Sequence, residues 1–505
     1  MSMPAEQLPT KPNLQQLLAG MADAPPLAIT GIADDSRRVR PGNLFIAWQG
    51  ATTHGLAHAP TAIERGAAAV AWDSATGDSK LASGSVPFIG IEGLGAGLGE
   101  VANRWYDSPS RSLRLAGVTG TNGKTTVAYL ATQAMQLLGR GCGYIGTLGA
   151  GIDELRSDVA LTTPPCLELH RLLAEFRDAG ADYSAIEVSS HALVQDRVNG
   201  LRFDTTIFTN LSRDHIDYHS DMRAYFESKA RLFTSHSSRH QVVSVDCEYG
   251  MELAERCGTG VVRVATRRDR QAGTGRHVAA RDIEAVAAGY RVRVASSWGQ
   301  ADVSVPLAGE FNVSNALVVL ALLLCWNVSF EDACAVIEYL AAPPGRLQRV
   351  AVEGSSLPAV YVDYAHTPAA LEAVLRALRS HTSARLWCVF GCGGDRDRGK
   401  RPLMGAVASR DADRAVVTND NPRTEPPSQI IADVLAGMDA EAIAIESRSA
   451  AIAYAIREAA PGDVVLIAGK GHEDYQIIGD QRHDFSDYQA ARANLEARAN
   501  EGERP

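Results

Sequence analysis

Residues 113–138 have the sequence LRLAGVTGTNGKTTVAYLATQAMQLL, in which an apolar run, a glycine-rich turn and a helical pattern follow one another directly. Leu113–Val118 has the length and composition of a buried strand, and Thr125–Leu138 has the pattern of a helix. Between them, GTNGKTT places glycines where main-chain N–H groups can approach phosphate oxygens at the start of a helix. The stretch therefore predicts a phosphate site in an α/β domain. A mere glycine-rich turn with a surface lysine would not need this strand and helix around it.

The loop residues also suggest how a triphosphate would be held. Lys124 can reach the terminal phosphates, and Thr125 offers its hydroxyl to Mg²⁺, as the Ser/Thr of a phosphate-binding loop does. The spacing is not that of a standard Walker A motif, because position 118, five residues before Gly123, is valine. We predict a variant ATP-binding loop made of Gly120, Thr121, Asn122, Gly123, Lys124, Thr125 and Thr126.

Strand and helix patterns continue on both sides of this loop. Strand signals occur at Asn43–Trp48, Ala67–Trp72, Phe88–Ile91, Ala185–Val188, Thr205–Phe208, Gln241–Val245, Ala359–Asp363, Leu386–Phe390, Ala415–Thr418 and Asp463–Ala468, and helical patterns at Asn312–Trp326, Ala369–Leu378, Gln429–Met438 and after Ala490. At about 150 residues per domain, 505 residues suggest three domains. We predict three α/β domains over 1–110, 111–343 and 344–505, with a mostly parallel, P-loop-type central sheet and a Rossmann-like C-terminal domain.

Composition excludes several classes of protein. Lys and Arg number 49 against 59 Asp and Glu, a formal net charge of −10, which argues against wholesale binding to nucleic acid or an acidic membrane. The eight cysteines have no paired zinc-ligand spacing and no disulfide-rich density. The N-terminus lacks a signal-peptide pattern, and no apolar stretch has the length of a membrane span. We expect reduced thiols in a cytoplasmic protein without a membrane anchor.

Acidic and histidine side chains follow two of the predicted strands. Glu187 ends the strand in IEVSSH, where a carboxylate would face the ligand crevice of an open sheet; the plainer alternative is a strand-end surface acid. His215 lies in NLSRDHIDYH after the next strand. A lone histidine is more often structural, but beside a nucleotide site His215 is a candidate ligand for a second metal ion.

Seven motifs occur in one order along the chain: GTNGKTT, EVSSHAL, TNLSRDHIDYH, DYAHTP, FGCGGDRDRGKRP, DNPRTE and GKGHEDYQ. Together they resemble the Mur ligases, and within that family the enzymes that add the third residue of the peptidoglycan stem peptide. The resemblance extends from Asp35 to Asp487. GTNGKTT alone is shared with folylpolyglutamate synthases, so the later motifs carry the distinction.

The resemblance implies an ATP-dependent ligase of peptidoglycan precursor synthesis, and hence of cell wall biogenesis, cell shape and cell division. Such an enzyme phosphorylates the D-Glu carboxylate of UDP-N-acetylmuramoyl-L-alanyl-D-glutamate, and an incoming amine then attacks the acyl phosphate to form an amide. ADP and phosphate are released. The expected partners are these small molecules, without nucleic acid or a membrane anchor, and the expected state is a monomer.

The resemblance also assigns the catalytic centre to Lys124, Glu187, His215 and Lys229. It places one Mg²⁺ on Thr125 and Glu187 and a second near His215 and Lys229, with Lys229 carbamylated to N6-carboxylysine. Carbamylation has a physical purpose, because it turns a cation that would repel Mg²⁺ into an anionic oxygen ligand. Without the resemblance, Lys229 looks like a surface residue of an amphipathic helix.

The remaining expected contacts fall into three groups. The UDP-substrate contacts are Ser36, Thr162, Thr163, Ser189, Gln195 and Arg197, although Thr162-Thr163-Pro164-Pro165 also suits a rigid turn. The additional ATP contacts, mostly on a C-terminal domain expected to close over the nucleotide, are Asn315, Arg346, Asp363 and His366. The amino-acid contacts are Arg396, Asp420, Asn421, Pro422, Arg423, Gly469 and Glu473.

The sequence DNPR at 420–423 bears on which amino acid is added. It resembles the form found in enzymes that use meso-diaminopimelate, whereas lysine-adding relatives lack the arginine. Diaminopimelate has one more carboxylate than lysine, which the Arg423 guanidinium can bind with two hydrogen bonds, while Glu473 suits the ammonium at the same centre. The alternative for Arg423 is a solvent-exposed turn residue.

Four other functions fit the sequence less well. Within ligases, a lysine-adding enzyme differs at DNPR, and a folylpolyglutamate synthase would need neither DNPR nor Asp35-Ser36-Arg37. A phosphate-loop NTPase switch or kinase would leave the C-terminal amino-acid motifs without a role. A purely structural protein would leave the grouped Gly, Lys, Glu and His residues unexplained.

Overall fold

The computed structural model describes residues 11–502 except 51–52, 157–160, 217, 271–274, 287–288, 353–356 and 440–441. The first ten residues, on which the expectation of no targeting signal partly rests, lie outside this range. By contacts the chain divides into two compact units. One runs to Lys124 and includes Met135–Val242 and Glu255–Gly260, and the other holds the remaining residues.

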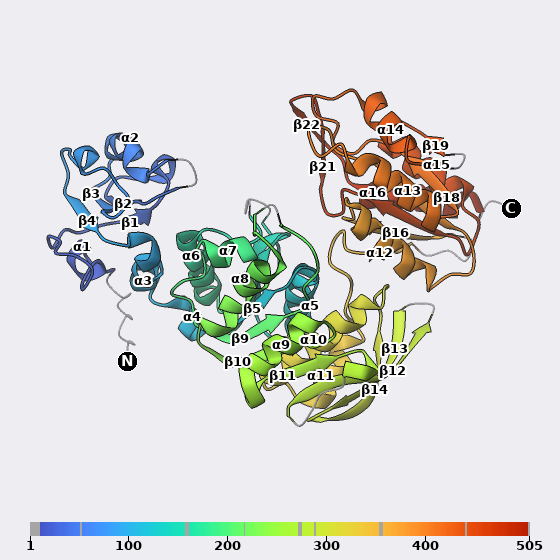
Figure 1. The fold of residues 1–505 in the computed structure, drawn as a ribbon, viewed down its shortest axis with the longest axis horizontal. Helices are drawn as coiled ribbons and strands as arrows, with labels where there is room; N and C mark the ends of the chain where they lie inside the picture. Colours follow the sequence, from blue (N-terminus) through green and yellow to red (C-terminus); the bar gives the residue numbers. More distant parts are fainter. Residues whose placement is uncertain are drawn as a thin grey trace, which may run out of the picture. The chain divides into compact units, whose positions relative to one another are not determined.

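A four-stranded parallel sheet forms the first part of the chain (Figure 1). Its strands, in spatial order, are β1 (Gly31–Ala33), β2 (Asn43–Ala47), β3 (Ala69–Asp73) and β4 (Phe88–Ile91). Alternate side chains of β2 and β3 point to opposite faces, as strand geometry requires. One face packs against α1 (Leu14–Leu17) and α3 (Leu94–Tyr106), and the other packs against α2 (Ala59–Glu64).

The central sheet has ten strands, in the order β14-β13-β12-β11-β10-β9-β5-β8-β6-β7. In chain order they are β5 (Arg114–Thr119), β6 (Cys142–Gly146), β7 (Gly149–Gly151), β8 (Tyr183–Glu187), β9 (Phe203–Phe208), β10 (Ser238–Ser244), β11 (Val262–Ala265), β12 (His277–Val286), β13 (Gly289–Ser296) and β14 (Gly299–Val305). β5 pairs in parallel with both β8 and β9, so the loops after these three strands leave the same edge. Every residue of β5 except Arg114 is buried, as expected for a central parallel strand.

Helices separate most of these strands along the chain. They are α4 (Pro109–Ser112), α5 (Lys124–Leu137), α6 (Cys166–Asp178), α7 (Ser190–Val194), α8 (Met222–Thr234), α9 (Glu248–Cys257), α10 (Phe311–Cys325) and α11 (Phe330–Ile337). The predicted apolar helix is α10, in which all but two residues are buried. Among the described residues, none of the helices combines the length and apolar character needed to cross a bilayer.

The C-terminal sheet is doubly wound. Its order is β15-β16-β20-β17-β18-β19, with strands β15 (Gln348–Arg349), β16 (Ala359–Asp363), β17 (Leu386–Phe390), β18 (Arg414–Val417), β19 (Ile443–Ala444) and β20 (Val464–Ala468). Only β15 is antiparallel to its neighbour. One face packs against α12 (Pro368–Arg379), α13 (Lys400–Asp411) and α14 (Pro427–Leu435), and the other against α15 (Arg448–Glu458) and α16 (Asp487–Gly502). A small hairpin, β21 (Tyr475–Ile478) and β22 (Gln481–Asp484), follows β20.

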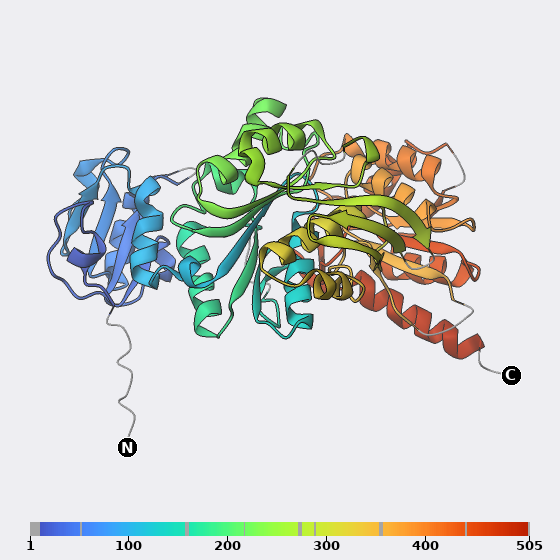
Figure 2. The ribbon, with the colours of Figure 1, turned by 90° about the horizontal axis from the view of Figure 1, so that it is seen from below.

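The predicted fold class is confirmed: the chain has three α/β domains, and the central one has a mixed, mostly parallel sheet. It missed the antiparallel strands β12–β14, the long yellow-green arrows of Figure 2. The helix predicted to reach Met438 ends at Leu435. A side chain at Gly437 would lie 1.9 Å from the carbonyl oxygen of Pro402 in α13, so the chain there packs tightly as a turn rather than continuing the helix.

Candidate active site

The loop between β5 and α5 folds around its own lysine. Lys124 Nζ donates to the carbonyl oxygens of Gly120, at 2.9 Å, and Thr121, at 2.8 Å. Gly120 has φ of 150°, and a Cβ there would lie 2.0 Å from Thr209 Oγ1. Gly123 also has a positive φ, of 84°. Glycine is therefore required at both positions, as the motif indicated.

The segment after β9 holds this loop in place. The amide nitrogens of Thr121 and Asn122 donate to the main-chain and side-chain oxygens of Asn210, at 2.9 and 3.0 Å. Thr209 Oγ1 donates to the carbonyl oxygen of Asn122 at 2.5 Å. Hydrogen bonds from the TNLSRDH segment therefore fix the GTNGKTT loop. Thr125 and Thr126 are buried in the first turn of α5, at the end of this loop.

Glu187 is buried at the carboxyl end of β8 and is held by three donors. Its Oε1 accepts from Tyr144 Oη at 2.6 Å and from the Thr147 amide at 2.8 Å, and its Oε2 accepts from Thr147 Oγ1 at 3.3 Å. A Cβ at Gly146 would lie 2.1 Å from Oε1, so the glycine makes room for the carboxylate. This places a fixed carboxylate at the edge of the sheet from which the phosphate loop also emerges.

Lys229 lies inside the protein rather than on its surface. Only 1% of the residue is exposed, and its Nζ donates to the carbonyl oxygen of Gly120 at 2.8 Å. Nζ also lies over the ring of Tyr225, 4.6 Å from its centroid, and Tyr225 Oη is 3.3 Å from Thr121 Oγ1. Burial, reinforced by the nearby charge of Lys124, lowers the pKa of Lys229 well below its usual 10.5. Lys124 and Lys229 therefore meet at one carbonyl oxygen.

His215 belongs to a group of aromatic side chains beside these lysines. Its backbone is left-handed, with φ of 52°, and its ring centroid lies 5.1 Å from that of His191 and 6.1 Å from that of Tyr225. His219, the last residue of DHIDYH, is buried and lies 3.0 Å from Ser190 Oγ through Nε2. Among the described residues, no three His, Cys, Asp or Glu side chains form a ready-made metal cage.

Five of the six expected UDP-substrate contacts gather near Glu187. Thr163 Oγ1 donates to the carbonyl oxygen of Glu187 at 2.8 Å and lies 3.4 Å from Ser189 Oγ. Arg197 Nη1 donates to the carbonyl oxygen of Thr163 at 2.8 Å, and its Nη2 donates to Gln195 Oε1 at 2.6 Å. Thr162 Oγ1 is 3.1 Å from Thr147 Oγ1. The sixth, Ser36, lies in the short turn Ser36–Arg38, whose Arg38 pairs with Glu168 of α6 at 3.3 Å.

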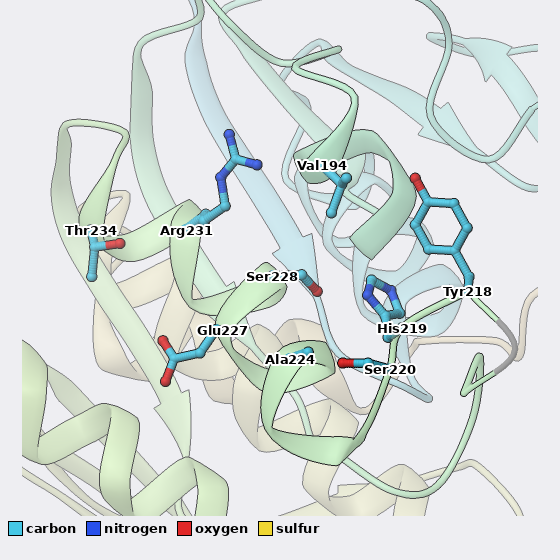
Figure 3. Close-up of a pocket in the computed structure, with 9 residues that line it drawn as sticks. All are labelled: Val194, Tyr218, His219, Ser220, Ala224, Glu227, Ser228, Arg231 and Thr234. Atoms are coloured by element: carbon cyan, nitrogen blue, oxygen red, sulfur yellow. The ribbon is translucent and has the colours of Figure 1, made fainter. Parts of the chain in front are cut away.

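A cavity of about 670 Å³ opens between α7 and α8 (Figure 3). Tyr218, His219 and Ser220 line one side, and Ser228 and Arg231 of α8 are among the residues on the other. Arg231 Nη2 pairs with Asp196 Oδ1 at 2.7 Å. None of the residues predicted to bind a substrate lines this cavity, although Gln195 Nε2 reaches the Tyr218 hydroxyl at 3.4 Å.

The second unit carries the other expected ATP contacts. Asp363 is buried at the end of β16, where its carboxylate accepts from the Leu347 and Ala365 amides, each at 2.7 Å. Burial raises its pKa, and the charge of Arg346 opposes the rise. The Arg346 guanidinium lies over the Tyr364 ring, and His366 Nδ1 is 2.8 Å from the Tyr364 carbonyl oxygen. These three residues thus gather around Tyr364, whereas Asn315 lies in α10 and bonds Asn312.

The expected amino-acid contacts meet where β18 and β20 end. Asn421 Nδ2 donates to Glu473 Oε2 at 3.0 Å, and a Cβ at Gly469 would lie 2.7 Å from Asp420 Oδ2. Arg423 has φ of 52°, and its Nη1 donates to the carbonyl oxygen of Gly394 at 2.8 Å. Its main chain is bound on both sides by the β21–β22 hairpin, through Ile477 and Gly479. Pro422 is buried within this loop, and Arg396 is exposed beside Asp395.

A buried ion network connects the two loops around Arg423. Arg401 is fully buried and donates to both oxygens of Glu425, at 2.8 and 3.1 Å, and to Asp433 at 2.8 Å. Glu425 Oε1 in turn accepts from the Asp395 amide at 2.6 Å. These hydrogen bonds, with Arg401 as their main cause, lower the pKa of Glu425 to about 2, so this carboxylate stays ionised.

Several residues of the site were missed in the sequence. Thr147 follows β6, and its place at a strand end was a usable signal. Tyr144, Tyr225 and Arg401 gave no local signal, because each acts through a partner more than twenty residues away. Lys470 lies within GKGHEDYQ, but the sequence did not predict a role for it.

Family comparisons agree with this arrangement. Three family models match successive parts of the chain: the Mur ligase family catalytic domain over 28–106, the Mur ligase middle domain over 118–323, and the Mur ligase glutamate ligase domain over 345–471. A relative from Pseudomonas putida is 48% identical over 472 residues, 92% of this chain and 94% of its own. One from Chromobacterium violaceum is 46% identical over 474 residues, 93% and 95% respectively. Both are named UDP-N-acetylmuramoyl-L-alanyl-D-glutamate--2,6-diaminopimelate ligase.

Solved structures give the same picture. A structure of a UDP-N-acetylmuramoyl-L-alanyl-D-glutamate--2,6-diaminopimelate ligase matches with a TM-score of 0.72 and 34% identity, over 97% of this chain and 99% of its own. The MurF ligase from Thermotoga maritima in complex with ADP matches with a TM-score of 0.60 and 15% identity, over 94% and 99%, which shows a shared fold alone. The matched models, the full-length relatives and the strand-end site together establish that this chain belongs to the Mur ligase family.

Proposed function

We propose that the chain is the ATP-dependent ligase that adds meso-diaminopimelate to the D-Glu carboxylate of UDP-N-acetylmuramoyl-L-alanyl-D-glutamate. The observation that carries this proposal is the amino-acid cluster, in which Arg423 and Glu473 place a cation and an anion on neighbouring loops. The distal centre of meso-diaminopimelate carries one carboxylate and one ammonium. Neighbouring loops that present a guanidinium and a carboxylate match that centre better than they match the lone ammonium of lysine.

The first chemical step brings the negatively charged substrate carboxylate against the negatively charged γ-phosphate of ATP. The substrate carboxylate oxygen attacks the γ-phosphorus of ATP, the bond to the β–γ bridging oxygen breaks, and ADP leaves. The amine nitrogen then attacks the acyl carbon, a proton is lost from nitrogen, and phosphate departs from the tetrahedral intermediate. Lys124 and the N–H groups at the start of α5 are the groups of this chain that stabilise the negative charge on the transferred phosphoryl group.

The donor set suits Mg²⁺. Magnesium is usually bound by one or two carboxylates together with substrate phosphates and water, rather than by a complete protein cage. Glu187 supplies a fixed carboxylate and Thr125 a hydroxyl, which agrees with the lack of a three-residue cage among the described residues. When bound, Mg²⁺ would neutralise phosphate charge. His215 and a carbamylated Lys229 would hold a second ion.

The surroundings of Lys229 support carbamylation. The neutral amine attacks CO₂, forming an N–C bond and releasing one proton, and the product is a carbamate anion. The lowered pKa of Lys229 raises the fraction of neutral amine near neutral pH, because burial disfavours the ammonium. The anion would lie between the cations of Lys124 and a metal ion, where its charge is compensated.

Removing CO₂ should therefore lower activity. Enzyme kept at pH 7.5 in degassed, CO₂-free buffer is expected to lose several-fold in its rate of phosphate release, and added bicarbonate should restore it, since the carbamate forms reversibly. Mass spectrometry of the intact chain under native conditions would report the added 44 Da. Full activity without CO₂, with no added mass, would contradict the assignment of N6-carboxylysine.

Phosphate release tests the proposed function directly. With ATP, Mg²⁺ and UDP-N-acetylmuramoyl-L-alanyl-D-glutamate, release should depend on meso-diaminopimelate and yield the tripeptide. Arg423→Ala should lower kcat/KM for diaminopimelate by about 10²-fold, because a charged carboxylate loses its bidentate partner. Exposed Arg482→Ala is the control, with little expected change. A preference for lysine would keep the ligase and refute the choice of amino acid, and release without any amine would favour an NTPase.

We further propose that the enzyme acts as a monomer in the cytoplasm, where its nucleotide substrates are found. The composition supports this, with no paired-cysteine pattern in the sequence and all eight cysteines free in the structure. Light scattering should give a mass near 53.8 kDa, and a dimer mass would contradict the proposed state.

A further inference from the structure

Lys470 is a buried cation in the amino-acid cluster. None of its side chain is exposed, and its Nζ donates to Glu473 Oε2 at 2.9 Å and to Asn421 Oδ1 at 3.1 Å. Asn421 Nδ2 donates to the same Glu473 Oε2 at 3.0 Å. The three side chains therefore form a closed triangle in which each is bonded to the other two.

The hydrogen bonds of this triangle leave one carboxylate oxygen of Glu473, Oε1, for a ligand. Both donors reach Oε2, and among the described residues no hydrogen bond reaches Oε1. Asn421 is fixed from the other side as well, because its Oδ1 also accepts from the Ile477 amide at 2.9 Å. The Glu473 side chain is 18% exposed, whereas that of Lys470 is fully buried.

From this geometry, and resting on the proposed function, we infer that Lys470 is a positioning and specificity-determining residue for the distal centre of the diamino acid. It holds Glu473 so that one oxygen faces the substrate ammonium. It also adds a positive charge that favours a substrate carrying a carboxylate at that end. Lys470 itself lies behind Glu473 and need not touch the substrate.

Charge explains how this selects the substrate. Among the charged side chains of this cluster, Lys470, Arg423 and Arg396 are positive and Glu473 and Asp420 are negative, a sum of one positive charge. A zwitterionic distal centre with a carboxylate complements that charge. Lysine brings only an ammonium to the same place, so it meets net repulsion, and Arg423 is left without a partner. Between buried and partly buried side chains such charges are only weakly screened. The ammonium of Lys470 thus disfavours lysine through its charge, beyond the missing contact to Arg423.

A purely structural role for Lys470 predicts something different. A lysine that only supports the fold would, when replaced, weaken both amines equally and affect the other substrates too. A misplaced Glu473 carboxylate likewise weakens both substrates, because diaminopimelate and lysine each bind it through an ammonium group. The ratio of kcat/KM for diaminopimelate to kcat/KM for lysine therefore isolates the charge effect from the positional one.

The experiment uses the full chain and Lys470→Met. We expect kcat/KM for meso-diaminopimelate to fall by about 10- to 100-fold, the effect of losing a hydrogen bond to a charged group. The diaminopimelate-to-lysine ratio should fall by about tenfold, with unchanged KM for ATP. Arg482→Met is the matched control, because Arg482 and Lys470 both lie over the Tyr475 ring, at 3.9 and 5.2 Å, but only Lys470 bonds Glu473. That control should leave the ratio unchanged.

A double-mutant cycle identifies the partner. In a Glu473→Gln background, Lys470→Met should cost much less than in the parent, because the carboxylate that Lys470 positions is already gone. An unchanged substrate ratio, or equal losses in the two backgrounds, would overturn the inference. If Lys470→Met does not fold, Lys470→Gln, which keeps the donors but not the charge, decides the same question. A parent that releases phosphate without diaminopimelate refutes the proposed function, whereas a diaminopimelate-dependent parent with an unchanged ratio in the variant refutes only this inference.

Discussion

Lys124→Ala should lower phosphate release by about 10³- to 10⁵-fold, the factor that one well-placed cation contributes to phosphoryl transfer. Lys124 is the cation of the loop that connects β5 and α5, and its ammonium rests on the carbonyl oxygens of Gly120 and Thr121. The substituted chain loses a positive charge where the proposed reaction develops negative charge, while the strand and helix remain. Phosphate release in the presence of all three substrates measures the effect, and thermal unfolding should change little.

Lys11→Ala is the matched control for this variant. Lys11 also donates its ammonium to a main-chain carbonyl oxygen, that of Trp105, at 3.0 Å, and lies over the Trp105 ring. It is exposed and far from the phosphate loop in sequence, so activity should stay within about twofold of the parent. Comparable activity losses in the two variants would mean that Lys124 is not the phosphate-binding cation.

Asp487→Ala should lower the free energy of unfolding of the C-terminal domain by about 3–5 kcal/mol, because it leaves a buried arginine without its counter-ion. Arg448 and Asp487 are both completely buried and are joined by two hydrogen bonds of 2.7 Å. The guanidinium also donates to the carbonyl oxygens of Asn419 and Ala468, at 3.0 Å each. Differential scanning calorimetry should show the transition of this domain at a lower temperature.

The same variant should weaken binding of the amino acid. Asn419 and Ala468 follow or end the strands β18 and β20, directly before Asp420 and Gly469, so Arg448 holds the roots of both loops. KM for diaminopimelate should therefore rise while KM for the UDP substrate does not. Asp474→Ala removes an exposed partner of Arg482 and should cost less than about 1 kcal/mol. Equal destabilisation by the two changes would contradict the role given to the buried pair.

Much of the fold followed from short apolar runs bounded by turn residues. The strands at 88–91, 359–363 and 386–390 have their predicted limits, since each is fully specified by its own sequence. The antiparallel strands were missed, although a signal was present. From Tyr290 to Val294, buried and exposed residues alternate, with Arg291 and Arg293 exposed. That period of two is the mark of a strand with one solvated face, which the prediction did not include.

The site was predictable where it depended on loops at strand ends. Glu187 and the glycines of the phosphate loop could be placed, because the carboxyl ends of parallel strands converge on one edge. Lys229 could be found only through the family resemblance, since nothing local distinguishes it from exposed lysines; it is buried because α8 packs that face inward. Arg401 was not predicted, because its partner Glu425 comes from another segment of the fold. Lys470 was not predicted, because Glu473 was not recognised as its partner.

The resting position of Lys124 has a consequence for turnover. Its ammonium is already satisfied by two carbonyl oxygens of the loop that surrounds it, so a nucleotide does not meet a bare cation. A nucleotide that binds Lys124 replaces these hydrogen bonds with its own. Its affinity is therefore set by the difference in free energy between the two sets. These carbonyl oxygens would thus compete for Lys124 with any nucleotide that the loop binds. The competition would weigh most heavily on a product that has lost its terminal phosphate, and so would favour departure of the spent nucleotide.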